Sequence, residues 1–163
     1  MIRSTFLTVI LLSLSIVGFC QGYSIAHHNL SLNLSNAIDL HFTSGANGVN
    51  MNFTTPNQFQ NGITITSAAR INVRSNKNFN MTVKSASNYF SSPSATQMPV
   101  TDVLWVKRNA QSSFINLSTT DQTIVANGNR GIRNYNITYK ATPGFNFDGG
   151  TYIANIVYTA TQQ

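Results

Sequence analysis

Apolar and polar residues alternate along most of the chain after residue 28. Successive side chains of a β-strand point to opposite faces of the sheet, so this alternation predicts strands buried on one face. Turn-forming residues separate the alternating stretches, most clearly at Asn61-Gly62. The predicted strands run over residues 29–35, 37–42, 63–65, 69–73, 79–83, 103–107, 114–117, 124–125, 135–139 and 151–161.

The number and spacing of these short strands predict an all-β fold. No helical period of useful length follows residue 22, and regular turn signals favour an immunoglobulin-like β-sandwich over a meander barrel. We find no internal repeat and no linker, so residues 23–163 are predicted to form a single sandwich domain.

The first 22 residues have the layout of a cleaved signal peptide. Arg3 supplies a positive charge, and residues 6–19 are almost all apolar or small. This run is shorter than the about 20 apolar residues that span a bilayer. We therefore predict export to the periplasm, the cell surface or the medium, with no membrane span once residues 1–22 are removed. There are two alternatives: the segment is retained as an N-terminal membrane anchor, or a lipid is attached to Cys20, the single cysteine.

Composition narrows the function classes further. The chain carries a formal net charge of +6, but it has only 4 acidic and 10 basic residues, and the basic ones are scattered. Nucleic-acid-binding domains concentrate Lys and Arg on one face, so nucleic acid is not an expected partner. Neutral Asn, Ser, Thr and Gln supply most of the polarity, which suits a surface that packs against copies of itself.

The last 29 residues, YNITYKATPGFNFDGGTYIANIVYTATQQ, contain Gly150, Tyr152, Ile156, Tyr158 and Thr159 at the spacing G-x-Y-x-x-x-(V/I)-x-(Y/V)-T. This segment resembles the closing strand of bacterial surface β-sandwich proteins, the fimbrial subunits and spore-coat-type pilins. The earlier stretch INVRSNKNFNMTVKSAS is similar to the paired central strands of such proteins.

The resemblance implies a pilin-like or adhesin-like subunit of a bacterial envelope. Chaperone–usher pilins complete their fold with an N-terminal strand donated by the next subunit, a form of β-strand addition. In this chain the donated apolar row would be Leu30, Leu32 and Leu34. Pairing of that strand within its own domain is the alternative.

The residues give little support for catalysis or for a metal site. His27, His28, Asp39 and His41 lack the spacing of a three- or four-ligand metal site. No Gly-x-Ser-x-Gly motif is present, and four scattered Asp residues are a poor supply for glycosidase chemistry. We therefore expect no enzyme activity, no cofactor and no bound metal.

The sequence supports two functional hypotheses. The first is a secreted or surface-exposed structural or adhesive subunit that assembles by β-strand addition, with copies of itself or other surface subunits as partners. The alternative is a monomeric secreted carbohydrate-binding module that binds glycans. Its candidate aromatic platform consists of Trp105, Tyr139, Tyr152 and Tyr158, which packing in a sheet would explain equally well.

Overall fold

The computed structural model describes residues 25–93 and 96–163. The described chain is mostly β-strand, in two antiparallel sheets, which confirms the all-β prediction. The predicted signal peptide, residues 1–22, lies outside the described residues, as does Cys20. No helix in the described part of the chain is long and apolar enough to cross a membrane.

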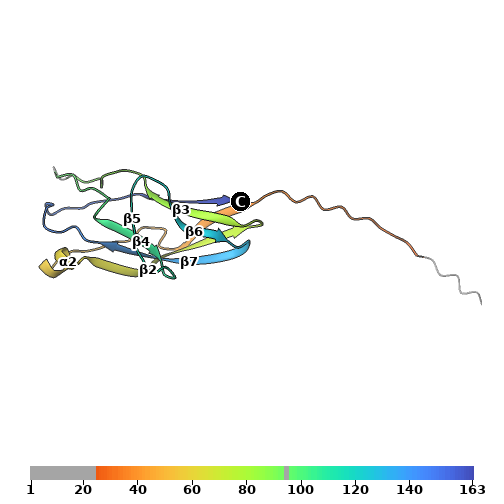
Figure 1. Ribbon diagram of the computed structural model, residues 1–163, viewed down its shortest axis with the longest axis horizontal. Coiled ribbons are helices and arrows are strands. Elements are labelled where there is room, and N and C mark those ends of the chain that lie inside the picture. Colours follow the sequence, from red (N-terminus) through yellow and green to blue (C-terminus); the bar gives the residue numbers. More distant parts are fainter. Residues whose placement is uncertain (1–24, 94–95) are drawn as a thin grey trace, which may run out of the picture. The chain divides into compact units, whose positions relative to one another are not determined.

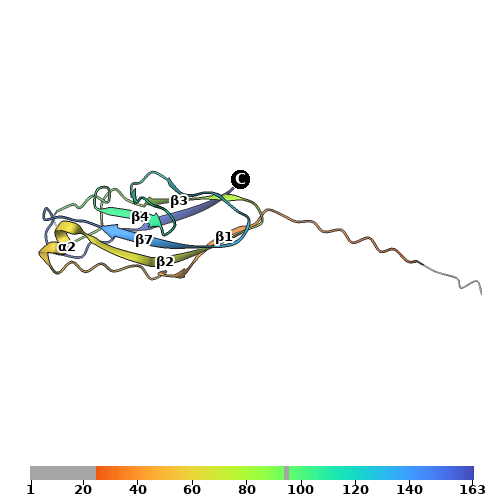
Figure 2. The ribbon, with the colours of Figure 1, turned by 60° about the horizontal axis from the view of Figure 1, so that its bottom comes forward.

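The larger sheet has five strands in the order β1-β2-β7-β4-β5. Figure 2 shows β1, β2 and β7 of this sheet side by side. In this order, the strands span Ile38–Ser44, Ile63–Ser75, Gly131–Ala141, Leu104–Arg108 and Ile115–Asn116.

Strand β2 joins two stretches that the sequence analysis predicted as separate strands, residues 63–65 and 69–73. Its register against β7 shifts between Ile65 and Ala69. Ser67 lies at this irregularity with a positive φ of 53°, a conformation that β-sheet residues do not adopt. The bulge interrupts the alternation of apolar and polar residues, but the chain pairs with β7 on both sides of it.

The smaller sheet has three strands in the order β6-β3-β8. They span Gln122–Gly128, Phe79–Ser85 and Ile156–Gln162, and β3 pairs antiparallel with both neighbours. The last strand is shorter than predicted: among residues 151–155, only Ile153 forms a β-bridge, an isolated one with Ser91.

A short helix, α2, spans Pro56–Asn61 and was missed by the sequence analysis. The side-chain oxygen of Gln58 accepts hydrogen bonds from the backbone N–H of Thr55 at 3.1 Å and of Thr54 at 2.8 Å. These bonds satisfy donors that the first helical turn leaves free. Six residues are too few to show an apolar helical period, so the pattern of apolar and polar residues did not predict this helix.

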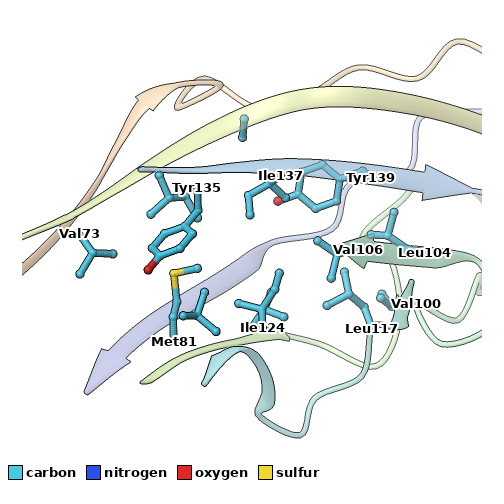
Figure 3. Close-up of a cluster of buried hydrophobic side chains, with 14 of the residues drawn as sticks. Val73, Met81, Val100, Leu104, Val106, Leu117, Ile124, Tyr135, Ile137 and Tyr139 are labelled. Carbon is cyan, nitrogen blue, oxygen red and sulfur yellow. The ribbon is translucent and has the colours of Figure 1, made fainter. Parts of the chain in front are cut away.

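The hydrophobic core lies between the two sheets. Figure 3 shows Met81 and Ile124 of the smaller sheet on one side, and Tyr135, Ile137 and Val106 of the larger sheet on the other. All five side chains are buried. The alternation in β3 is confirmed, because Phe79, Met81 and Val83 have no exposed surface.

The strands of the domain formed by residues 35–163 end at two opposite ends, which we call the turn pole and the helix pole. At the turn pole, Ser75 pairs with both Ile38 and Gly131, and Phe79 pairs with Gln162. At the helix pole, α2 precedes β2, and the loops 86–103 and 142–153 meet: the backbone N–H of Thr142 donates to the carbonyl of Val103 at 2.9 Å. Figure 1 shows α2 and the C-terminus at opposite ends of the sheets.

Candidate strand-addition surface

Strand β8 lies at the edge of the smaller sheet. Within the described residues it pairs with β3 on one side and with no strand on the other. Its inward-facing residues Ile156, Tyr158 and Ala160 pack against the core but remain partly exposed. An edge strand presents a row of unpaired N–H and C=O groups, to which an extended peptide can add.

The larger sheet also ends on this side of the domain, at β1. Leu40 and Phe42 of β1 face inward and are partly exposed, like their counterparts on β8. The rings of Phe42 and Tyr158 meet edge to face, with centroids 5.8 Å apart at 82°. Both sheets therefore end beside an apolar row that nothing in the described chain fully covers.

Residues 49–53, which follow β1, extend this partly covered row. Val49, Met51 and Phe53 pack against the core, whereas Asn50 and Asn52 between them are exposed. This alternation is typical of a strand, yet the segment belongs to neither sheet. By contrast, the apolar side chains of β3, the central strand of the smaller sheet, are completely buried.

Two tyrosines lie beneath this surface. The hydroxyl groups of Tyr139 and Tyr158 are 2.7 Å apart and form a hydrogen bond between β7 and β8. Burial raises the pKa of the Tyr158 hydroxyl well above its ordinary value, and the nearby Tyr139 adds to the shift. Burial also raises the pKa of Tyr139. The pair links the two sheets next to the open edge.

The tyrosine pair predicts a loss of stability at alkaline pH. Unfolded tyrosines ionise at about pH 10, whereas these two stay protonated in the folded domain, so the stability present below pH 10 falls as pH rises. Each group contributes a slope of up to about 1.4 kcal/mol per pH unit. Urea unfolding between pH 7 and pH 11.5 measures this slope.

Tyr158→Phe should remove part of that slope, and it should cost about 1 kcal/mol at pH 7 because the Tyr139 hydroxyl loses its partner. Tyr89→Phe, at an exposed tyrosine, is the matched control and should leave the stability at pH 7 unchanged. If the unfolding free energy of Tyr158→Phe falls with pH as steeply as that of the wild type, the alkaline loss of stability does not come from this tyrosine pair.

The segment predicted to donate a strand has the exposure that donation requires. Residues 25–37 contain no regular secondary structure, so the strand predicted at residues 29–35 is absent. Leu30, Leu32 and Leu34 are 77%, 75% and 88% exposed. Three leucines in a row at every second position is a pattern that one face of a strand would bury.

The predicted C-terminal residues occupy two different settings. Ile156 and Tyr158 lie in β8 on the face that packs against the core. Tyr152 lies before the strand, at the helix pole, where its hydroxyl donates to the carbonyl of Asp148 at 2.9 Å and its ring meets Phe90 edge to face. The sequence pattern did not show that β8 is an edge strand.

The structure does not bring together the aromatic residues considered for a sugar platform. Val106 and Tyr139 are cross-strand partners that face the core, so Trp105, next to Val106, lies on the opposite face of the larger sheet. Tyr158 also faces the core. A single flat platform cannot contain residues from both faces.

The candidate metal ligands do not converge either. The described residues contain no group of three or more His, Cys, Asp or Glu side chains that could hold a metal ion. Asp39 binds His41 at 3.0 Å and Arg74 at 2.9 Å, and hydrogen bonds from His41 and then Arg74 lower its pKa. This carboxylate is therefore already engaged by two neighbours on β1 and β2.

Comparison with known proteins adds no relative to this geometry. The chain matches no protein-family model, and no curated protein matches its sequence.

Proposed function

We propose that this protein is an exported structural or adhesive surface subunit, whose immunoglobulin-like β-sandwich joins other copies by β-strand addition. One observation carries the proposal: within residues 25–93 and 96–163, no strand pairs with the outer edge of β8, which lies above an apolar row that is only partly covered. A soluble protein usually blocks such an edge with charges, Pro or a covering loop, because it invites pairing with another chain. Here β8 carries no charged residue and no Pro.

The chain also contains a segment with the chemistry of the missing strand. Residues 29–34 read NLSLNL, which places leucines on one face and Asn or Ser on the other. An added strand of this kind would cover Ile156, Tyr158 and Leu40 with leucines and leave its polar face in solvent. The resemblance of residues 135–163 to fimbrial subunits supports the same mode of assembly.

Light scattering coupled to size-exclusion chromatography tests this function on the exported chain starting at Tyr23. We expect oligomers or polymers for this chain, and monomers when residues 25–34 are deleted. Residues 35–163 form a compact unit by their own contacts, so the shortened chain should still fold. A chain that remains monomeric at high concentration would count against the proposal.

A matched pair of variants separates the apolar row from the length of the segment. Leu30→Asn, Leu32→Asn and Leu34→Asn together should abolish assembly, because the leucines would no longer fill the row beside β8. Asn29→Ala, Ser31→Ala and Asn33→Ala together change the opposite face of the same strand and should leave assembly intact. Equal effects of the two triple variants would argue against insertion with one face buried.

A further inference from the structure

The outer face of the larger sheet carries three cations that have no carboxylate partner. Arg70 lies on β2, Lys140 on β7 and Lys107 on β4. Each directly follows a residue of the hydrophobic core, so by alternation its side chain points away from the core. In the part of the chain that the structure describes, the ion pairs use Asp39 and Asp121 and none involves these three cations. Their charges are therefore available to a partner.

The strand register brings the three cations into one patch, which we call the outer basic face. Positions 140, 138 and 136 of β7 mark three successive rows across neighbouring strands. Lys140 occupies the first row, Lys107 pairs with the second, and Arg70 pairs with the third. The three rows extend about 14 Å along the strands, and the three strands extend about 10 Å across the sheet. Residues that are scattered in the sequence thus share one compact surface.

Two aromatic rings hold the lysines in place on this face. The Nζ of Lys140 lies 5.8 Å from the ring centroid of Trp105, and the Nζ of Lys107 lies 4.9 Å from that of Phe114. Attraction between an ammonium group and the face of an aromatic ring positions the cation but leaves its charge in place. Both rings are themselves partly exposed. The face therefore combines positive charge with ring surface that a ligand can contact.

Neutral amides extend the same face along β7. Asn134 and Asn136 are exposed and alternate with Tyr135, which is buried in the core. The Asn72 amide on β2 donates to the side-chain oxygen of Asn134 at 2.9 Å and fixes its orientation. A side-chain amide both donates and accepts hydrogen bonds, so this row suits a ligand that carries hydroxyl groups.

The acidic residues do not balance the outer basic face. The chain has only four of them. Asp121 lies before β6 of the smaller sheet, and Asp148 lies at the helix pole. Asp39, on β1, is paired with Arg74 at 2.9 Å. Asp102 borders the face, where its carboxylate accepts a hydrogen bond from an amide of β5 at 3.2 Å. Three cations thus face a single unpaired carboxylate, and the surface is complementary to an anion.

From this arrangement we propose that the outer basic face binds an acidic polysaccharide whose sugar rings carry carboxylates. The carboxylates pair with the three cations, the apolar side of a sugar ring packs on Trp105 or Phe114, and the hydroxyl groups bond to Asn134 and Asn136. A nucleic acid fits less well, because DNA-binding proteins commonly neutralise about 6–10 phosphates and this face has three cations. The face uses no residue of the strand-addition surface, so this binding function is separate from assembly.

The fluorescence of Trp105 tests the location of binding directly, because it is the only tryptophan of the chain. Titration of the exported chain with alginate, a polyuronate, should change the tryptophan emission, and neutral dextran should not. Calorimetry gives the affinity independently. Binding should weaken as salt rises from about 0.15 M to about 1 M, because the screening length falls from about 8 Å to about 3 Å. No change in emission with alginate at low salt would overturn the proposal.

A matched pair of triple variants separates the face from net charge. Replacing all three cations of the outer basic face with Gln should weaken alginate binding about 10-fold, since exposed ion pairs contribute modestly and add over three sites. Lys77→Gln, Lys84→Gln and Arg130→Gln together remove the same charge from two turns and the smaller sheet, and should keep the wild-type affinity. An equal loss in both triple variants would refute a site on this face.

Two further arms identify the ligand class and keep this inference apart from the proposed function. If double-stranded DNA or vesicles containing phosphatidylglycerol bind more tightly than alginate and depend on the same three cations, the partner carries phosphates and the polysaccharide is refuted. The variant with Leu30→Asn, Leu32→Asn and Leu34→Asn should bind alginate as a monomer. A chain that assembles but does not bind refutes only the polysaccharide site, and one that binds but does not assemble refutes only strand addition.

Discussion

Phe79→Ala should destabilise the domain by about 3–5 kcal/mol, the range for truncating a buried aromatic side chain. Phe79 has no exposed surface and lies in β3, the central strand of the smaller sheet. Its ring meets Tyr135 of the larger sheet edge to face, with centroids 6.3 Å apart. Removing the ring leaves a cavity between the sheets, and a loss of this size is a large share of the 5–15 kcal/mol that stabilise a typical domain.

Urea unfolding of the full exported chain at pH 7 measures the Phe79→Ala effect. Ile132→Ala is the control, because that side chain is 68% exposed and its loss should change the stability by less than about 0.5 kcal/mol. Phe79→Leu keeps most of the volume and should fall between the two variants. A loss in Phe79→Ala no larger than that in Ile132→Ala would contradict the position of Phe79 in the core.

Gly62→Ala should destabilise the domain by about 3 kcal/mol, through two effects that add. Gly62 ends α2 with φ 79° and ψ 172°, a conformation that is almost exclusive to glycine. A Cβ at this position would lie 2.5 Å from the carbonyl oxygen of Ala141 and closer still to the Thr142 hydroxyl oxygen. The backbone of β7 cannot move away without breaking its pairing with Ile63.

Two further glycines separate these effects. Gly131→Ala meets a positive φ of 104° but no atom within 4 Å, so it should cost only the backbone strain, about 1 kcal/mol. Gly149→Ala meets neither constraint and should be close to neutral. Thermal unfolding of the three variants gives the comparison. A Gly62→Ala loss no greater than that of Gly131→Ala would show that the close approach to β7 is not maintained in solution.

The sequence predicted best those strands in which the alternation is both regular and buried. Residues 79–83 and 135–139 were predicted as strands because their inward residues are all apolar. Both predictions are confirmed, although β7 extends further, from Gly131 to Ala141. The irregular parts were less predictable. The bulge at Ser67 hid the continuity of β2, and α2 depends on the hydrogen bonds of Gln58 rather than on an apolar period.

The strand-addition surface was also predictable only in part. Alternation placed Ile156 and Tyr158 on one face of a predicted strand, and it placed Leu30, Leu32 and Leu34 on one face of another. It could not show which strand has an unpaired edge, because that depends on pairing between distant segments, such as Phe79 with Gln162.

By itself, the sequence determined the all-β class and the faces that most strands bury, because a two-residue period is a local property of the chain. The tertiary structure alone decided that β1 and β8 lie at neighbouring edges, where Phe42 meets Tyr158, and that residues 29–35 join neither sheet. Strand order is set by the packing of two sheets around one core, which involves all the strands together. A local pattern therefore predicts that a strand exists, whereas only the folded domain shows which of its edges remains open.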